Sequence, residues 1–441
     1  MLMVSYHFPP IAGVGVQRTL KHVTYLPEAG WTPSVIAPRG AAYRLMDHAS
    51  VAALPRDLEL HRSFCYEPAR LRRQAARAMR FLRGTSPSSG PGGGGPGGGS
   101  ASPLNAAWSS SVRFLFFPDE QLLWIPFAVR SAVRAHRDRP VAALYSTSPP
   151  VSSHLIAGLV KGMTRLPWIA DFRDPWIGNS YAAPLPRLHR YLQARLERWI
   201  VHRADRVVFA SSGLRRRYAE RYPSLAHRFV VIPNGYDPAE MQLVAPARPD
   251  AESTGTAVVR LAYTGSVYGE DELPIFAAGL ELALERRPEL RDRLRVEFIG
   301  WMTDANARLV DQLRPRLGDV VSRTGFLPRE IALARLQAAD AGLVLIAAGP
   351  GRDVVVTGKL FEYIGLSKQI LAMVPPGDAR ELLNDLHWGI VADPEPESVA
   401  QALHRLVDAP APRGQADPVG TYDRRRLAGR LGALLDEVVE D

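Results

Sequence analysis

The chain has 441 residues, of which 46% are apolar and 22% charged, so it is long enough for two or three domains with ordinary hydrophobic cores. Its single cysteine, Cys65, excludes an internal disulfide and favours a reducing compartment. No apolar run approaches the roughly 18 residues that span a bilayer, and no targeting segment precedes the first strand, so we expect a soluble cytoplasmic protein.

The positive charge is partly concentrated in one segment. The formal net charge is +9, from 54 basic and 45 acidic side chains, and eight of the arginines fall between residues 56 and 83. Apolar residues recur at roughly helical spacing over 69–83. This basic helix either lies on an anionic membrane surface or presents an ordinary solvated face. We recognise no nucleic-acid-binding module and expect no nucleic-acid partner.

The chain opens with a predicted strand over 2–6 and an amphipathic helix that follows Gly13 and Gly15. A glycine at a helix start lets a phosphate approach free backbone N–H groups, although a tight strand-to-helix turn would equally require glycine. A second strand is predicted at 33–38. This alternation is the first half of a Rossmann-like unit.

Two irregular segments follow. Residues 84–103 consist almost entirely of glycine, proline and serine, and are predicted to be a disordered surface insertion because they cannot bury enough apolar area to order themselves. Residues 112–127 are apolar and aromatic. They either pack into the core of the first domain or contact a lipid-like acceptor.

Regular alternation returns after residue 139, with strands predicted at 142–150, 167–176, 205–211 and 229–235 and helices at 151–163, 186–204 and 212–223. Asp171, Arg173 and Asp174 follow an apolar run, at the carboxyl end of a buried strand, where site residues collect in parallel sheets. They are candidate site residues. The alternative is a buried ion network that only fixes the loop.

A linker is predicted at 241–257, which has no hydrophobic period. It separates an N-terminal domain, 1–240, from a C-terminal domain, 258–420, and a final amphipathic helix occupies 421–441. The second half contains predicted strands at 258–266, 294–301, 320–326, 341–348, 369–374 and 389–393, with helices between them. The predicted fold class is α/β: two Rossmann-like domains facing each other across a cleft, with the C-terminal helix able to pack back on the first.

The stretch 349–376 carries the clearest indication of a ligand. A glycine-rich loop ends at Thr357, a predicted N-cap, and leads into a helix whose free N–H groups favour an anion. Lys359 adds a charge, and Arg352 can bind a phosphate through two N–H groups. Glu362 lies one turn further on, where its carboxylate can accept hydrogen bonds from a diol. Phosphate and diol together indicate a nucleotide; alternatively, Lys359 and Glu362 form only a surface ion pair.

Seven segments together resemble the family-four retaining glycosyltransferases, which have the two-domain GT-B fold. In chain order they are FPP and its glycine loop at 8–15, STSPP at 146–150, DFRDPW at 171–176, ADRVVFAS at 204–211, IPNGYD at 232–237, YTGSVYG at 263–269 and GKLFEYIG at 358–365. They run in family order over nearly the whole chain. The last segment is most similar to members with a KLFEYL-type helix, which act in polysaccharide or secondary-metabolite glycosylation.

The resemblance implies a retaining transfer of a sugar from a nucleotide diphosphate sugar to the hydroxyl of a glycan, lipid-linked sugar or small molecule, without a metal or other cofactor. Glu362 would bind the donor ribose, and Lys359 would lie near the diphosphate. The implied donor-binding residues are Gly13, Gly15, Gly265, Ser266, Phe326, Leu327, Arg352, Gly358, Lys359, Leu360 and Glu362. The implied catalytic residues are Asp171, Arg173, Asp174, Lys359 and Glu362.

Two positions depart from the family pattern. The glutamate that commonly precedes the one matching Glu362 by eight residues is Val354 here, and Asp353 could replace it only if the loop shifts. The Arg and Lys that often follow the first glycine of the second domain are absent from 266–271, so Arg352 and Lys359 would have to stabilise the leaving diphosphate.

Two other functions fit the same fold. One is a sugar-nucleotide epimerase, and the other is a non-catalytic nucleotide-sugar-binding partner subunit. The expected location is the cytoplasm, at the inner membrane face if the 69–83 helix binds lipid.

Overall fold

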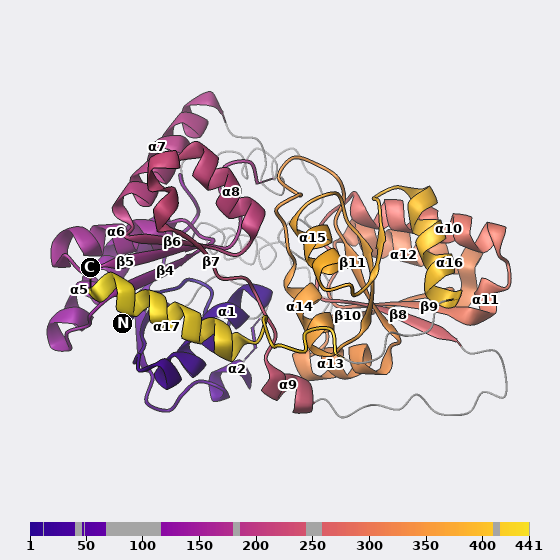
Figure 1. Cartoon of the computed structure of the whole chain (residues 1–441), viewed down its shortest axis with the longest axis horizontal. Coiled ribbons are helices and arrows are strands. Elements are labelled where there is room, and N and C mark those ends of the chain that lie inside the picture. The colour runs from indigo at the N-terminus through magenta and orange to yellow at the C-terminus, as the bar shows by residue number, and fades with distance from the viewer. Residues whose placement is uncertain are drawn as a thin grey trace, which may run out of the picture. The chain divides into compact units, whose positions relative to one another are not determined.

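The computed structural model describes residues 1–11, 13–39, 46–47, 49–67, 116–179, 186–243, 258–408 and 415–440. The predicted 69–83 helix, the 84–103 insertion, the first part of the 112–127 segment and most of the predicted linker lie outside these residues. The described residues form two compact units, and Figure 1 labels their elements. The described residues within 1–234 and 424–440 form the first unit, and those within 235–423 form the second.

The first unit is built on seven parallel strands in the order β3-β2-β1-β4-β5-β6-β7. The strands are β1 (Leu2–Val4), β2 (Ser34–Arg39), β3 (Glu59–Phe64), β4 (Leu144–Ser148), β5 (Trp168–Phe172), β6 (Arg206–Phe209) and β7 (Phe229–Val231). The α-helices are α1 (Val14–Tyr25), α2 (Ala49–Ala52), α5 (Ile125–Asp138), α6 (Ser152–Thr164), α7 (Arg187–Arg203), α8 (Ser212–Arg221) and α17 (Arg424–Glu440). The 3-10 helices are η1 (Leu26–Ala29), η2 (Leu122–Trp124) and η3 (Pro223–Arg228).

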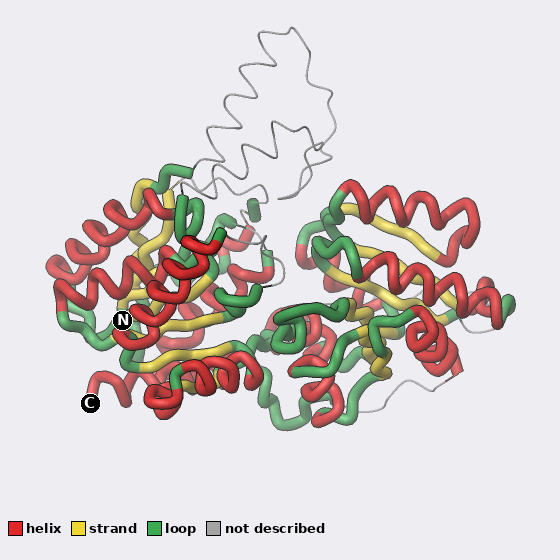
Figure 2. Tube along the Cα trace, turned by 90° about the horizontal axis from the view of Figure 1, so that it is seen from above, coloured by secondary structure: helices red, strands yellow, loops and turns green. Residues whose placement is uncertain are grey.

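Helices cover both faces of this sheet (Figure 2). On one face, Met3 and Tyr145 belong to the same buried cluster as Leu431 and Leu435 of α17, which lies beside α1. Neighbouring strand residues point to the opposite face, where α5 and α6 pack against β2, β3 and β4. The structure thus confirms that the C-terminal helix returns to the first unit.

The second unit is built on six parallel strands in the order β10-β9-β8-β11-β12-β13. The strands are β8 (Val259–Thr264), β9 (Leu294–Ile299), β10 (Val321–Gly325), β11 (Ala341–Leu345), β12 (Gln369–Met373) and β13 (Ile390–Ala392). The helices are α9 (Pro238–Leu243), α10 (Glu272–Arg286), α11 (Leu290–Arg293), α12 (Asp304–Leu317), η4 (Gly318–Val320), α13 (Arg329–Ala338), α14 (Gly358–Gly365), α15 (Asp378–Asp385) and α16 (Pro396–Asp408). One core packs α10, α12 and α16 on the sheet, and a second core on the other face packs α13, α14 and α15.

Numbered within each unit, the strands of both sheets begin in the order 3-2-1-4-5-6, which is the order of dinucleotide-binding Rossmann folds. Both units are therefore Rossmann-like, as predicted. The strand order reverses between β1 and β4 in the first sheet and between β8 and β11 in the second. Ligands of open α/β sheets bind at the carboxyl ends of strands beside such a reversal.

The first unit ends at Asn234, earlier than the predicted boundary at 240, and α9 occupies the start of the predicted linker. The reason is the packing of Tyr236, whose backbone N–H donates to Tyr422 O at 3.0 Å. A Cβ on Gly365 would lie 2.5 Å from the Tyr236 ring. These contacts attach residues 235–243 to the second unit.

Strand β3 and helix α5 were not predicted from the sequence. Strand β3 contains Glu59, His61 and Arg62 and lies at the edge of the sheet, so it lacks the apolar run of a central strand. None of the described helices is long and apolar enough to cross a membrane.

Candidate functional site

Most of the predicted site residues of the second unit lie on the loop after β8, on the loop after β11 or on the helix α14 that follows it, at the strand-order reversal. The first loop begins at Gly265, whose φ of +93° favours glycine. Its N–H donates to Ile299 O at 2.8 Å, and a Cβ on Gly300 would lie 2.1 Å from Gly265 O. The two backbones therefore approach too closely for a side chain on Gly300, and this contact fixes the loop.

Tyr363 attaches α14 to the same edge of the sheet. Its hydroxyl lies 3.1 Å from Thr264 N and 3.2 Å from Leu343 O, so it bridges the end of β8 and the middle of β11. Its ring lies against Gly342, where a Cβ would come within 2.4 Å of it. The first turn of α14, with Gly358 and Leu360, is consequently held beside the Gly265 loop.

Lys359 projects from this first turn toward the Gly265 loop. Its Nζ lies 3.4 Å from Ser266 O and 4.4 Å from the centroid of the Tyr263 ring. Burial lowers the pKa of Lys359 to about 8. Within the described residues Lys359 forms no ion pair, so the simple Lys359–Glu362 surface pair considered from the sequence is wrong.

Glu362 is paired instead with Arg329, a residue that the sequence analysis did not single out. Arg329 Nη1 donates to Glu362 Oε1 at 2.6 Å, and Nη2 donates to Glu240 Oε2 at 3.0 Å. Burial alone would lower the pKa of Arg329, but the two carboxylates outweigh it and raise that pKa. The other carboxylate oxygen of Glu362 receives no hydrogen bond from the described residues.

Arg352 occupies a position different from the one expected. Its side chain is only 8% exposed, and its Nη1 donates to the buried Glu272, with Asp271 Oδ2 lying 3.4 Å from Nη2. Its charge is therefore matched by carboxylates at the start of α10. This pairing corrects the prediction that Arg352 is available to a phosphate, and it ties the 349–357 loop to α10.

The rest of that loop is fixed through its backbone and interior. Asp353 O accepts from Asp378 N at 2.7 Å, and Val354 is 5% exposed. An apolar side chain thus points into the interior at the position where the resembled family keeps a glutamate. Thr357 stands at the N-cap position as predicted, but its hydroxyl forms no capping hydrogen bond.

The two residues expected to border a base differ in exposure. Phe326 and Leu327 lie between β10 and α13, and the Phe326 ring is 52% exposed. Leu327 packs partly against the core around α13 and α14. Phe326 therefore offers a flat apolar surface, whereas Leu327 mainly supports the loop.

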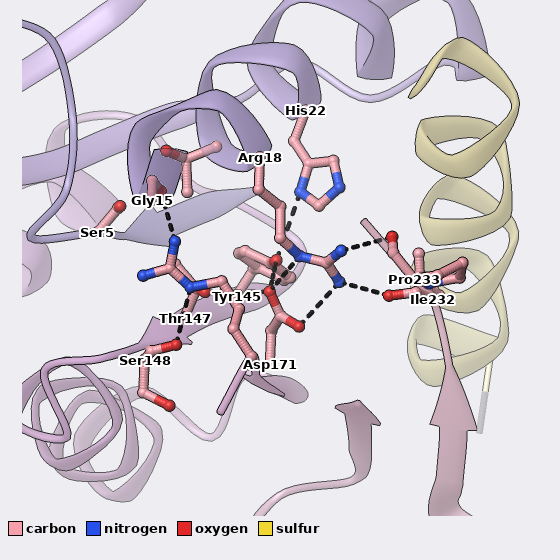
Figure 3. A network of polar contacts seen from close by, with 12 residues as sticks. Ser5, Gly15, Arg18, His22, Tyr145, Thr147, Ser148, Asp171, Ile232 and Pro233 are labelled. Carbon is pink, nitrogen blue, oxygen red and sulfur yellow. Dashed lines mark hydrogen bonds and ion pairs between the residues drawn. The ribbon is translucent and has the colours of Figure 1, made fainter. Parts of the chain in front are cut away.

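In the first unit, Asp171 is fully buried at the end of β5 (Figure 3). Arg18 donates to it from Nε at 2.8 Å and from Nη2 at 2.9 Å, and Tyr145 and Thr147 donate their hydroxyls. Burial would raise the pKa of Asp171, but Arg18 outweighs it and the net pKa is lowered. Arg18 also reaches Ile232 O at 2.9 Å. Asp171 is thus the centre of a buried ion network, the alternative left open from the sequence.

Arg173 links the end of β4 to the start of α1. It donates to Ser148 O at 2.9 Å, to Pro149 O at 3.1 Å and to Gly15 O. A Cβ on Gly15 would lie 3.2 Å from its Nη1, so Gly15 makes room for the guanidinium. Gly13 is the N-cap of α1, with φ +120°, and Asp174 is exposed. Of the carboxylates 171 and 174, only the second is open to solvent.

Within the described residues, no cluster of His, Cys, Asp and Glu side chains has the arrangement of a metal site.

Comparisons with known proteins agree first on the class of fold. The structure is similar to sucrose-phosphate synthase from Thermosynechococcus elongatus, at 14% identity with a TM-score of 0.63, covering 99% of this chain and 98% of that one. It is also similar to Anabaena HepE in complex with UDP and glucose (13%, 0.58, 99% of each chain). A third similar structure is the UDP-forming trehalose-phosphate synthase from Burkholderia vietnamiensis (12%, 0.60, 100% and 99%). These similarities over the full length establish the fold as GT-B, with two Rossmann-like units.

The comparison of sequence families is more specific but covers less of the chain. A family model described as Glycosyltransferase Family 4 matches residues 95–240. This segment includes the described part of the first unit from α5 to β7. A search of curated protein sequences finds no match.

Proposed function

We propose that this protein is a glycosyltransferase that moves a sugar from a nucleotide diphosphate sugar to an acceptor hydroxyl. The observation that carries the proposal is the convergence of Lys359, Glu362 and the Gly265 loop at the strand-order reversal of the second unit. The family match and the similarity to a protein whose structures hold UDP and UDP-glucose support the same donor class.

The diphosphate, the ribose and the base of the nucleotide sugar each have a chemically suitable partner in the second unit. The diphosphate would bind at the N-terminus of α14 beside Lys359, because free N–H groups and an ammonium both attract an anion. The ribose hydroxyls would donate to the open carboxylate oxygen of Glu362, and the base would contact the exposed Phe326 ring. As the glycosidic bond breaks, negative charge grows on the diphosphate, and Lys359 with the helix N-terminus would stabilise it.

Retention of configuration, independence of metals and a place in polysaccharide, glycolipid or secondary-metabolite biosynthesis are parts of the same proposal. They rest on the resemblance of 358–365 to KLFEYL-type helices and of the other motifs to the retaining family. A metal is unnecessary if Lys359 and the α14 N-terminus meet the charge of the leaving group. Within the first unit, Arg173 and Asp174 remain the candidates near the transferred sugar.

One experiment separates this function from the two alternatives. The protein is incubated with UDP-, GDP- and dTDP-sugars, with and without acceptors and EDTA, while nucleoside diphosphate release and sugar identity are followed. Release that requires an acceptor and survives EDTA supports a metal-independent transferase. Conversion of the sugar without an acceptor indicates an epimerase, and binding without turnover indicates a non-catalytic subunit. Glu362→Ala should abolish transfer while the melting temperature is retained.

We also propose peripheral contact with the inner face of an anionic membrane. The 69–83 segment that suggested it lies outside the described residues, but α7 supports it. Its first two turns expose Leu188 (60%), Tyr191 (58%) and Leu192 (38%), and its later turns expose Arg195 and Arg198. Apolar side chains beside arginines suit a headgroup layer. Binding to anionic but not neutral vesicles, reversed by salt, would support this contact, and its absence would refute it.

A further inference from the structure

We propose that Arg329 is a positioning residue that aims the free oxygen of Glu362 at the donor ribose. This inference deepens the proposed function and rests on it. Arg329 is the first residue of α13, and it lies between two carboxylates from different helices, Glu240 of α9 and Glu362 of α14. The pairing spans 89 residues on one side and 33 on the other.

The geometry assigns different tasks to the three donor atoms of Arg329. Its Nε and Nη2 both donate to Glu240 Oε2, at 3.2 and 3.0 Å, which fixes the plane of the guanidinium. The remaining Nη1 donates to Glu362 Oε1 at 2.6 Å. Because a guanidinium is rigid and planar, holding one edge against Glu240 determines where the other edge points.

The contact with Glu362 uses one carboxylate oxygen and leaves the other. A two-point pairing between Arg329 and Glu362 would occupy both oxygens and compete with a diol. With a single contact, Glu362 is held in one orientation and still has lone pairs for hydroxyl donors. The Glu362 side chain is 13% exposed, so an unpaired carboxylate at this depth would be costly. Arg329 therefore holds Glu362 in one orientation and occupies only one of its two carboxylate oxygens.

The test compares nucleotides that differ only in the hydroxyls that Glu362 would bind. Affinities of UDP, GDP and ADP, and of their 2′,3′-dideoxy counterparts, are measured by calorimetry for the wild type, Arg329→Gln and Arg329→Lys. For the base that binds, the wild type should prefer the ribonucleotide by about tenfold or more, since hydrogen bonds to a charged group are strong. Both variants should lose most of this preference, while their affinity for the dideoxynucleotide stays within about twofold of wild type.

Two further variants complete the design. Glu240→Ala removes the group that orients the guanidinium, and it should lower the ribonucleotide preference even if an Arg329 variant folds poorly. Arg335→Gln is the matched control, because Arg335 lies on the same helix but pairs with Glu297. It should bind both nucleotides as the wild type does.

The outcomes separate this inference from the function on which it rests. If the wild type prefers the ribonucleotide and the Arg329 and Glu240 variants keep that preference, Arg329 is structural only and the inference is overturned while the nucleotide site stands. If the wild type binds no nucleotide, or binds both forms equally, the proposed ribose contact of Glu362 is wrong, and this inference is overturned with it.

Discussion

Lys359 is buried, and burial disfavours the charged form of its side chain. Burial lowers its pKa to about 8, and the negative charge of Glu362 opposes this shift only in part. Above pH 8 the side chain is therefore increasingly neutral in the free protein. A bound diphosphate favours the charged form, so binding in this range should be accompanied by proton uptake.

We accordingly expect nucleoside diphosphate affinity to fall as the pH rises through about 8, because each binding event must then protonate Lys359. Lys359→Gln should bind more weakly at neutral pH and lose this dependence. Calorimetry in buffers of different ionisation enthalpy measures the protons taken up. Equal proton uptake by the wild type and Lys359→Gln above pH 8 would show that another group titrates.

Substitutions of Asp171 and Asp174 should have different effects, the first mainly on stability and the second mainly on activity. Asp171→Asn leaves Arg18 buried without a full counter-charge, and breaking a buried pair costs about 3–5 kcal/mol. Its melting temperature should fall strongly. Asp174→Asn changes an exposed side chain, so its melting temperature should stay near wild type while donor turnover falls. Thermal unfolding and a turnover assay measure both, and an unchanged melting temperature for Asp171→Asn would contradict the scaffold role.

Single residues could be predicted from the sequence where the signal was local. Lys359 and Glu362 follow a glycine-rich loop at a helix start, and the structure places both on that first part of α14. Arg18 and Arg329 could not be found in this way, because their carboxylate partners are 153 and 33 residues distant. The prediction that Arg352 binds a phosphate was wrong for the same reason. Its partner Glu272 is 80 residues away in the sequence, so the pairing could not be foreseen.

Among the elements, α14 depends on one glycine of a neighbouring strand. Gly342→Ala should push the Tyr363 ring off β11, since the new Cβ would come within 2.4 Å of it, and thereby displace Lys359 and Glu362. We expect a lower melting temperature and weaker nucleotide binding. Gly162→Ala in α6 is the control, because nothing lies within 4 Å of the new Cβ and alanine favours a helix. Similar losses in both variants would mean that the Tyr363 contact is unimportant.

Strands that are buried and apolar along most of their length were predicted well. The central strands β5, β11 and β12 read as apolar runs because both of their faces are covered. The edge strand β3 is mostly half-buried and polar, so its sequence carried no such run. Helix α5 was not predicted because its first residues belong to the apolar, aromatic segment 112–127, which was expected to pack into the core or contact a lipid.

For the molecule as a whole, α17 completes the first unit after the chain has built the second. Gly432→Ala should destabilise the protein, because the new Cβ would lie 2.7 Å from Ala29 Cβ and force α17 away from η1. Gly429→Ala, on the same helix but with nothing within 4 Å, should be neutral or stabilising by about 0.5–1 kcal/mol. Thermal unfolding of the pair tests whether α17 belongs to the stability of the first unit. Equal melting temperatures would show that it does not.

The position of α17 also imposes an order on biosynthesis. Residues 1–234 leave the ribosome before roughly 190 residues of the second unit, and only then does α17 follow. Translation proceeds at about 5–20 residues per second. The sheet face around Met3 and Tyr145 is therefore synthesised about 10–40 s before α17, which covers it in the folded protein. During that interval the nascent first unit exposes an apolar surface that a chaperone could bind, while the second unit, contiguous in sequence, can fold at once.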